Sequence, residues 1–69
     1  MKKHKVKMKY RVGDYVRIKN TTQVGIIIAV KKGSLPCYTI QNLKSNLCTE
    51  YYNGFVGISK SDVAWYLIN

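Results

Sequence analysis

The chain has 69 residues, of which 46% are hydrophobic and 12% aromatic, so it is long enough for one small domain and too apolar to be disordered. Twelve Lys and Arg against three Asp and Glu give a net charge of +9. This charge argues against a basic target and favours a polyanionic partner. The alternative is that the charge only keeps the domain in solution.

Cysteine and histidine are scarce. Cys37, Cys48 and His4 cannot supply the four ligands of a structural zinc site, so we expect neither a metal nor a cofactor. A disulfide between the two cysteines stays open at this point. No apolar stretch reaches the roughly 18 residues of a membrane span, and the basic start MKKHK is not followed by a signal-peptide core. We therefore expect a cytoplasmic protein with free thiols and no membrane partner.

The N-terminal segment alternates strictly between basic and apolar residues from residue 5 to residue 12. As a strand, it would place Val6, Met8, Tyr10 and Val12 on one face and Lys5, Lys7, Lys9 and Arg11 on the other. The many lysines repel one another, so residues 1–7 form either an edge strand or a disordered basic arm. We place the start of the folded domain at residue 8, giving a domain of residues 8–69.

The same alternation continues after Gly13, which predicts a strand over residues 15–19 and a polar turn over residues 20–23. The run VGIIIAV, residues 24–30, is dense in β-branched residues and predicts the strongest strand. Its even members are expected to face the core: Val24, Ile26, Ile28 and Val30. Gly25 within this strand predicts a bulge or bend.

The second half of the chain predicts further short strands. After a basic loop at residues 31–35, a strand is expected over residues 37–43, a polar connection over residues 44–50 and a fourth strand over residues 51–59, curved at Gly54 and Gly57. Ser59 or Ser61 is expected to cap one helical turn. The apolar run at residues 64–68 predicts a closing strand, with Trp65 at least half buried.

Together these elements predict an all-β domain, a five- to six-stranded barrel made from a strongly bent antiparallel sheet with a single 3₁₀ turn before the last strand. Closure of the barrel would remove its free edges. An OB-fold has a similar number of strands and ranks second, because it usually needs a longer chain and an additional helix.

The segment YRVGDYVRIKNTTQVGIIIAV, residues 10–30, resembles the opening of SH3-like barrels of the KOW and Tudor type. The matching features are an aromatic residue before the Gly13–Asp14 pair, an alternating strand and a polar turn that leads to Gly25. The segment VGISKSDV, residues 56–63, resembles the end of such barrels, where a 3₁₀ turn leads into a short last strand.

In KOW-like domains, the glycine that Gly25 matches lets the chain turn tightly beside RNA or a protein partner. In this chain, the basic loop that usually precedes that glycine is replaced by NTTQ, residues 20–23. This replacement weakens the expectation of a loop contact with RNA. Tudor-like relatives hold methylated side chains in an aromatic cage, but a chain of net charge +9 would repel a basic tail. A cell-wall-targeting SH3-like domain is disfavoured by the missing secretion signal.

Catalysis is not expected. His4 lies in the basic arm, the three carboxylates are isolated in the sequence, and there is no phosphate-cradling glycine loop or nucleophile elbow. Asp14, beside Gly13, is expected to form a turn or cap a backbone amide rather than act as a base. We therefore predict a protein that is not an enzyme and has no small-molecule substrate.

Because side chains alternate between the two faces of a strand, several cationic side chains and a tyrosine are expected on one outer face. Phosphate binding needs such a surface. The candidate nucleic-acid-binding residues are Lys7, Lys9, Arg11, Tyr15, Arg17, Lys19, Lys31 and Lys32. We expect an accessory domain that grips DNA or RNA phosphates. The alternative is a protein-interaction module, phage or mobile-element encoded, that docks an acidic partner or a sheet edge. Tyr51, Tyr52 and Trp65 remain either stacking platforms or core members.

Overall fold

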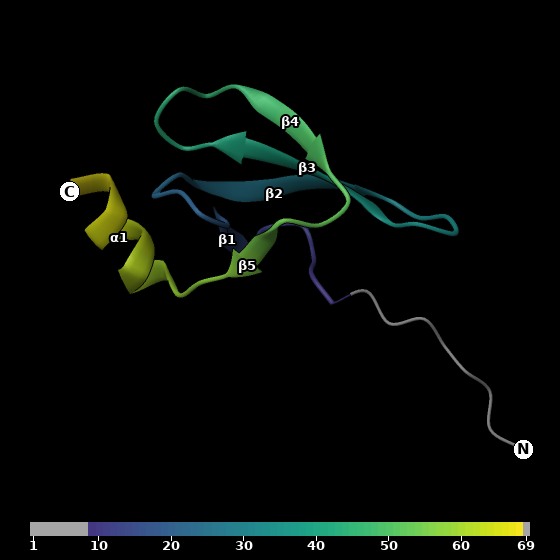
Figure 1. Ribbon diagram of the computed structural model, residues 1–69, viewed down its shortest axis with the longest axis horizontal. Helices are drawn as coiled ribbons and strands as arrows, with labels where there is room; N and C mark the ends of the chain where they lie inside the picture. The colour runs from purple at the N-terminus through teal and green to yellow at the C-terminus, as the bar shows by residue number, and fades with distance from the viewer. Residues whose placement is uncertain (1–8, 69) are drawn as a thin grey trace, which may run out of the picture.

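The computed structural model describes residues 9–68, which form a five-stranded antiparallel sheet followed by one helix (Figure 1). The elements are β1 (Tyr15–Ile18), β2 (Val24–Lys31), β3 (Cys37–Asn42), β4 (Cys48–Tyr51), β5 (Phe55–Gly57) and α1 (Lys60–Ile68). The strand order is β4-β3-β2-β1-β5, and every neighbouring pair is antiparallel. The two edge strands, β4 and β5, are not paired with each other, so the sheet curves without closing into the expected barrel.

The predicted strand at residues 5–12 is wrong in the part that the structure describes, because residues 9–14 form a bend and a turn. The Asp14 amide donates to the Arg11 carbonyl at 3.0 Å, and the Asp14 carboxylate accepts the Arg11 amide at 2.9 Å. Gly13 takes φ +98°, a conformation that glycine adopts without the steric cost of a side chain. The expected turn role of Asp14 is thus confirmed, and this turn delays the first strand until Tyr15.

Of the even members of β2 that were expected to face the core, Val24 is buried at 3% exposure, but the predicted orientation is wrong in the middle of the strand. Val16 of β1 pairs with Gly25, so the odd residues that follow Gly25 share the face of Val16. Ile27 is accordingly fully buried, whereas Ile28 is 42% exposed. A register shift between Ile27 and Ala29 inserts one extra residue into β2. Beyond this shift the even residues point to the core side, so Val30 packs against the core.

Gly25 marks a close approach of β2 to β3 rather than the bulge itself. A Cβ atom at this position would lie 2.5 Å from Ile40 Cγ2 and 2.7 Å from the Gln41 carbonyl oxygen. The second of these neighbours is backbone and cannot move aside without distorting the strand. Only glycine fits, and this lets the sheet curve around its core.

The core lies on the concave side of the sheet. Val16, Ile27 and Ile40 form its aliphatic part, and Tyr38 and Phe55 pack edge to face beside them with ring centroids 5.4 Å apart. Tyr10 and Tyr51 complete the cluster, at 4.9 and 6.2 Å from the Phe55 ring. These aromatic contacts hold β5 against β3 and β4, where no backbone ladder joins them.

The strand predicted over residues 51–59 is two strands separated by a turn. β4 already begins at Cys48, inside the predicted polar connection, and β5 covers only Phe55–Gly57. Gly54 takes φ +90° between them. The turn reverses the chain so that β5 pairs with β1 instead of extending β4.

The predicted 3₁₀ turn and closing strand at residues 64–68 are wrong, because helix α1 runs over Lys60–Ile68. The Ser59 hydroxyl accepts the Asp62 amide at 3.1 Å and so confirms the expected cap. Val63 is 5% exposed, but Trp65 is 57% exposed and therefore less buried than expected. Within residues 9–68, α1 is too short to cross a membrane.

The two cysteines are not joined. Cys37 is buried at the start of β3, and Cys48 is exposed at the start of β4. Cys48 pairs with Gln41, four residues along β3 from Cys37, which corresponds to roughly 13 Å of strand. A disulfide needs Cα atoms within about 7 Å, so this sheet register excludes the bond that the sequence left open.

Candidate functional site

The outer face of β1, which was predicted to bind phosphates, is partly covered by helix α1. Tyr15 and Arg17 share that face and are half-buried. The Arg17 guanidinium lies 5.9 Å from the Tyr66 ring centroid and donates to the Thr21 carbonyl at 3.0 Å. Arg17 is therefore held in a structural role between the helix and the β1–β2 turn.

Lys31 and Lys32 lie far from β1, so they do not join the other candidates on the predicted outer face. The four-residue β1 pairs with β2 only from Val24 to Ile26, and β2 continues for five more residues to Lys31. The Lys31 ammonium instead lies 3.6 Å from the Glu50 carboxylate, with both side chains exposed. An exposed pair of this kind stabilises the fold little but neutralises one of the two predicted cations.

The N-terminal candidates separate from one another. Lys7 lies outside the described residues, and Arg11 is exposed on the Arg11–Asp14 turn. Lys9 is exposed, and its ammonium lies 5.8 Å from the Tyr10 ring centroid. The seven predicted residues that the structure describes thus do not form one continuous face.

Two of the predicted cations do meet, in a groove of about 370 Å³ beside the β4–β5 loop. We call it the aromatic groove. Its lining residues are Lys9, Tyr10, Lys19, Pro36, Tyr38, Tyr52, Asn53, Gly54 and Phe55. The set contains two lysines, four aromatic rings and no carboxylate, which suits an anionic ligand with an aromatic or apolar part.

Several elements fix the walls of the aromatic groove. The Lys19 amide donates to the Gly54 carbonyl at 2.9 Å and ties the end of β1 to the β4–β5 loop. Tyr10 packs against Phe55 and lies over Gly57, where a Cβ atom would approach its ring to 3.2 Å. The groove is therefore built on the aromatic core, while the ends of Lys9 and Lys19 remain exposed.

The acidic side chains lie elsewhere. Asp14 and Asp62 line a separate hollow next to Tyr15, on the helix side of the sheet, and Glu50 pairs with Lys31. Lys9 lines this acidic hollow as well as the aromatic groove. The separation of carboxylates from Lys19 and Tyr52 favours the aromatic groove over the β1 face as an anion site.

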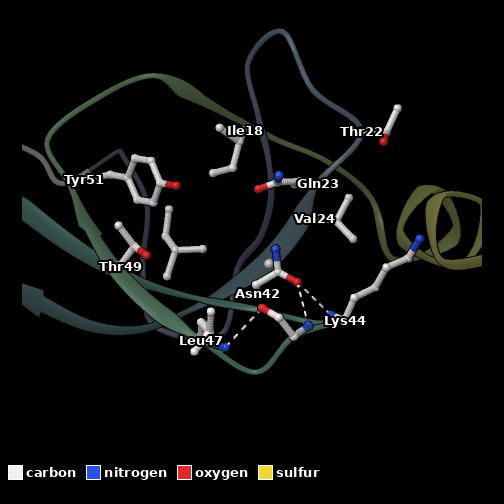
Figure 2. Close-up of a pocket in the computed structure, with 12 residues that line it drawn as sticks. Ile18, Thr22, Gln23, Val24, Asn42, Lys44, Leu47, Thr49 and Tyr51 are labelled. Atoms are coloured by element: carbon white, nitrogen blue, oxygen red, sulfur yellow. Dashed lines mark hydrogen bonds between the residues drawn. The ribbon is translucent and has the colours of Figure 1, made fainter.

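A further cavity, of about 400 Å³, lies between the β1–β2 and β3–β4 loops (Figure 2). Its wall is mixed, with Ile18 and Val24 beside Gln23, Asn42 and Tyr51 (Figure 2). The Asn42 side-chain oxygen accepts the amides of Lys44 and Ser45 at 2.8 and 3.0 Å, which shapes the β3–β4 loop. Among residues 9–68, Lys44 is its only charged lining residue, and none of the predicted phosphate-binding residues in that range contributes to it.

The sequence did not decide between Tyr51 and Tyr52, and the structure separates them. Tyr51 packs into the core against Phe55, while Tyr52 is 61% exposed in the aromatic groove. The Asn53–Gly54 pair is a turn signal that would have predicted the loop carrying Tyr52. Pro36 also lines the aromatic groove. Its place there depends on contacts between segments that are distant in the chain, and the sequence has no local signal for such contacts.

Residues 9–68 contain no group of three His, Cys, Asp or Glu side chains that could hold a metal ion. No family model matches the chain, and neither the curated proteins nor the solved structures gave a match.

Proposed function

We propose that this protein is a non-catalytic nucleic-acid-binding domain that contacts phosphates through Lys9 and Lys19 at the aromatic groove. The observation that carries the proposal is the convergence of these two exposed lysines on a groove whose described lining residues include no carboxylate. The net charge of +9 supports it, because long-range attraction would bring a polyanion to this surface. The proposal moves the site from the outer face of β1 to the opposite, aromatic side.

We further propose that the fold is an open relative of the SH3-like barrels of the KOW and Tudor type. The curved five-stranded antiparallel sheet and the glycine at position 25 support this resemblance. The α-helix in place of a closing strand and the unpaired edges of β4 and β5 are departures from it. Under this proposal, Gly25 shapes the sheet instead of contacting the nucleic acid.

The test is binding of fluorescent DNA and RNA oligonucleotides at several salt concentrations. The double variant Lys9→Glu, Lys19→Glu is expected to bind more weakly than the wild type and to lower the slope of log K against log salt by about 1 to 2, because two phosphate contacts are lost. Lys44→Glu with Lys60→Glu is the matched control. It has the same net charge, but both of its positions are exposed outside the aromatic groove.

Equal losses of affinity and slope in the two double variants would contradict the proposed location, since charge alone would then explain binding. A wild-type protein that binds no nucleic acid at low salt would overturn the proposed function itself. Circular dichroism of each variant should show the same folded spectrum, because all four lysines are exposed.

A protein-interaction module is the second candidate, and the exposed side of α1 favours it. Trp65 and Ile68 are 57% and 82% exposed on this short helix, and β4 leaves one edge of the sheet unpaired. Such surfaces suit a partner that adds a strand or packs on the helix. Capture of one acidic protein that survives nuclease treatment, and loses binding with Trp65→Ser, would support this candidate over nucleic-acid binding.

A further inference from the structure

We infer that the aromatic groove takes an unpaired nucleotide, with the base stacked on the Tyr52 ring and the flanking phosphates on Lys19 and Lys9. This inference rests on the proposed function and narrows it to single-stranded nucleic acid. The ring of Tyr52 is 61% exposed, and it makes no hydrogen bond or ring contact with another residue in the range 9–68. A large aromatic surface of this kind is costly to leave in water.

The chain on both sides of Tyr52 is anchored by its neighbours. On one side of Tyr52, Tyr51 packs against the core ring of Phe55. On the other side, Gly54 takes φ +90° and its carbonyl accepts the Lys19 amide at 2.9 Å. Because both flanks are fixed, stacking on Tyr52 orders little additional chain, which favours affinity.

The two lysines lie where a nucleic-acid strand with a base stacked on Tyr52 would carry its phosphates. Lys9 and Lys19 line the same groove as Tyr52, and Asn53 adds a polar side chain beside them. The ammonium groups suit phosphates, whereas the face of a tyrosine ring suits any base. Within the part of the chain that the structure describes, the lining contains no acid that would repel the nucleic-acid backbone.

The geometry selects against a duplex. In a double helix the faces of the bases are stacked on one another, so an exposed ring can reach them only in unpaired or frayed segments. The groove volume of about 370 Å³ is at the small end of ligand sites and suits one residue of a strand instead of a helical segment. Stacking on a ring does not read the 2′-hydroxyl, so single-stranded DNA and RNA should both bind.

The experiment compares four probes of about 12 nucleotides, within the range of known site sizes for small β domains. They are single-stranded DNA, single-stranded RNA, a DNA duplex and an abasic strand with the same phosphates but no bases. Fluorescence anisotropy at low salt is expected to show both natural single strands binding roughly 5- to 100-fold more tightly than the abasic strand.

Tyr52→Leu should abolish that preference and leave binding to the abasic strand and to the duplex unchanged. Tyr52→Phe keeps the ring and should keep the preference. Trp65→Leu removes another exposed aromatic ring, outside the aromatic groove, and should also keep it. These changes are at exposed positions, so each variant is expected to fold.

The two proposals fail in different ways. If the wild type binds the abasic strand as well as the natural strands, or if Tyr52→Leu retains the preference, the stacking inference is wrong while phosphate binding stands. A Tyr52→Phe variant without the preference would also overturn the inference. If the wild type binds none of the four probes, the proposed function fails, and the stacking inference fails with it.

Discussion

At the scale of single residues, Gly25 shows how one position controls the curvature of the sheet. Gly25→Ala would place a methyl group within 3 Å of the Ile40 side chain and the Gln41 carbonyl, so we expect a loss of about 1–3 kcal/mol in the free energy of unfolding. Gly33→Ala is the control, because a Cβ atom there meets nothing within 4 Å. Urea denaturation of the two variants measures the difference, and equal midpoints would contradict the close approach.

The phase of β2 gives a second prediction at this scale. Ile27 is fully buried and Ile28 is 42% exposed beside the register shift. Ile27→Ala should therefore lower the free energy of unfolding by about 2–5 kcal/mol, and Ile28→Ala by less than about 1.5 kcal/mol. Thermal and urea unfolding measure both losses of stability. A larger loss for Ile28→Ala than for Ile27→Ala would contradict the burial of Ile27 and favour the orientation expected from the sequence.

The sequence predicted local roles of side chains well when the partner was close in the chain. The turn at Asp14 and the cap at Ser59 follow from residue type and from backbone amides within three positions. The inward face of β2 could not be predicted in the same way. In the run Ile26–Ile27–Ile28, successive residues are equally apolar, and only pairing with Val16 and the shift before Ala29 decides which one is buried.

At the scale of elements, helix α1 depends on its first turn. The Ser59 hydroxyl accepts the Asp62 amide, so Ser59→Ala should destabilise the helix by about 1 kcal/mol. Ser61→Ala is the comparison, because the Ser61 hydroxyl contacts that of Ser59 and caps no backbone amide in the described chain. Far-ultraviolet circular dichroism during heating measures both variants, and a larger effect at Ser61 would contradict the assigned cap.

The apolar run at residues 64–68 shows why the sequence predicts a closing strand where the structure has helix α1. A short apolar run has no period that separates a strand from a helix. The deciding features are the Ser59 cap, the Asp62 carboxylate in the first turn and the burial of Val63, which lies before the run. Because the helix packs against β2, it also covers part of the face predicted to bind phosphates.

At the scale of the whole molecule, the positive charges do not gather on the outer face of β1, where the alternation of side chains predicted them. Four of the twelve lysines and arginines precede the described residues: Lys2, Lys3, Lys5 and Lys7. Within the described part, Arg17 is bound to a turn and Lys31 to Glu50, and neither Arg11 nor Lys32 lines the aromatic groove. Lys9 and Lys19 are therefore the predicted cations that converge there. The composition led us to propose a polyanionic ligand, whereas the proposed place of binding on the molecule required the fold.

Nuclear magnetic resonance tests the location of the site most directly, and a chain of 69 residues is well suited to it. During titration with a single-stranded oligonucleotide, we predict that the largest amide shift changes fall on Lys9, Lys19 and residues 52–54, with small changes on β1 and α1. Shift changes concentrated on Tyr15, Arg17 and the helix, with the aromatic groove unaffected, would contradict the account.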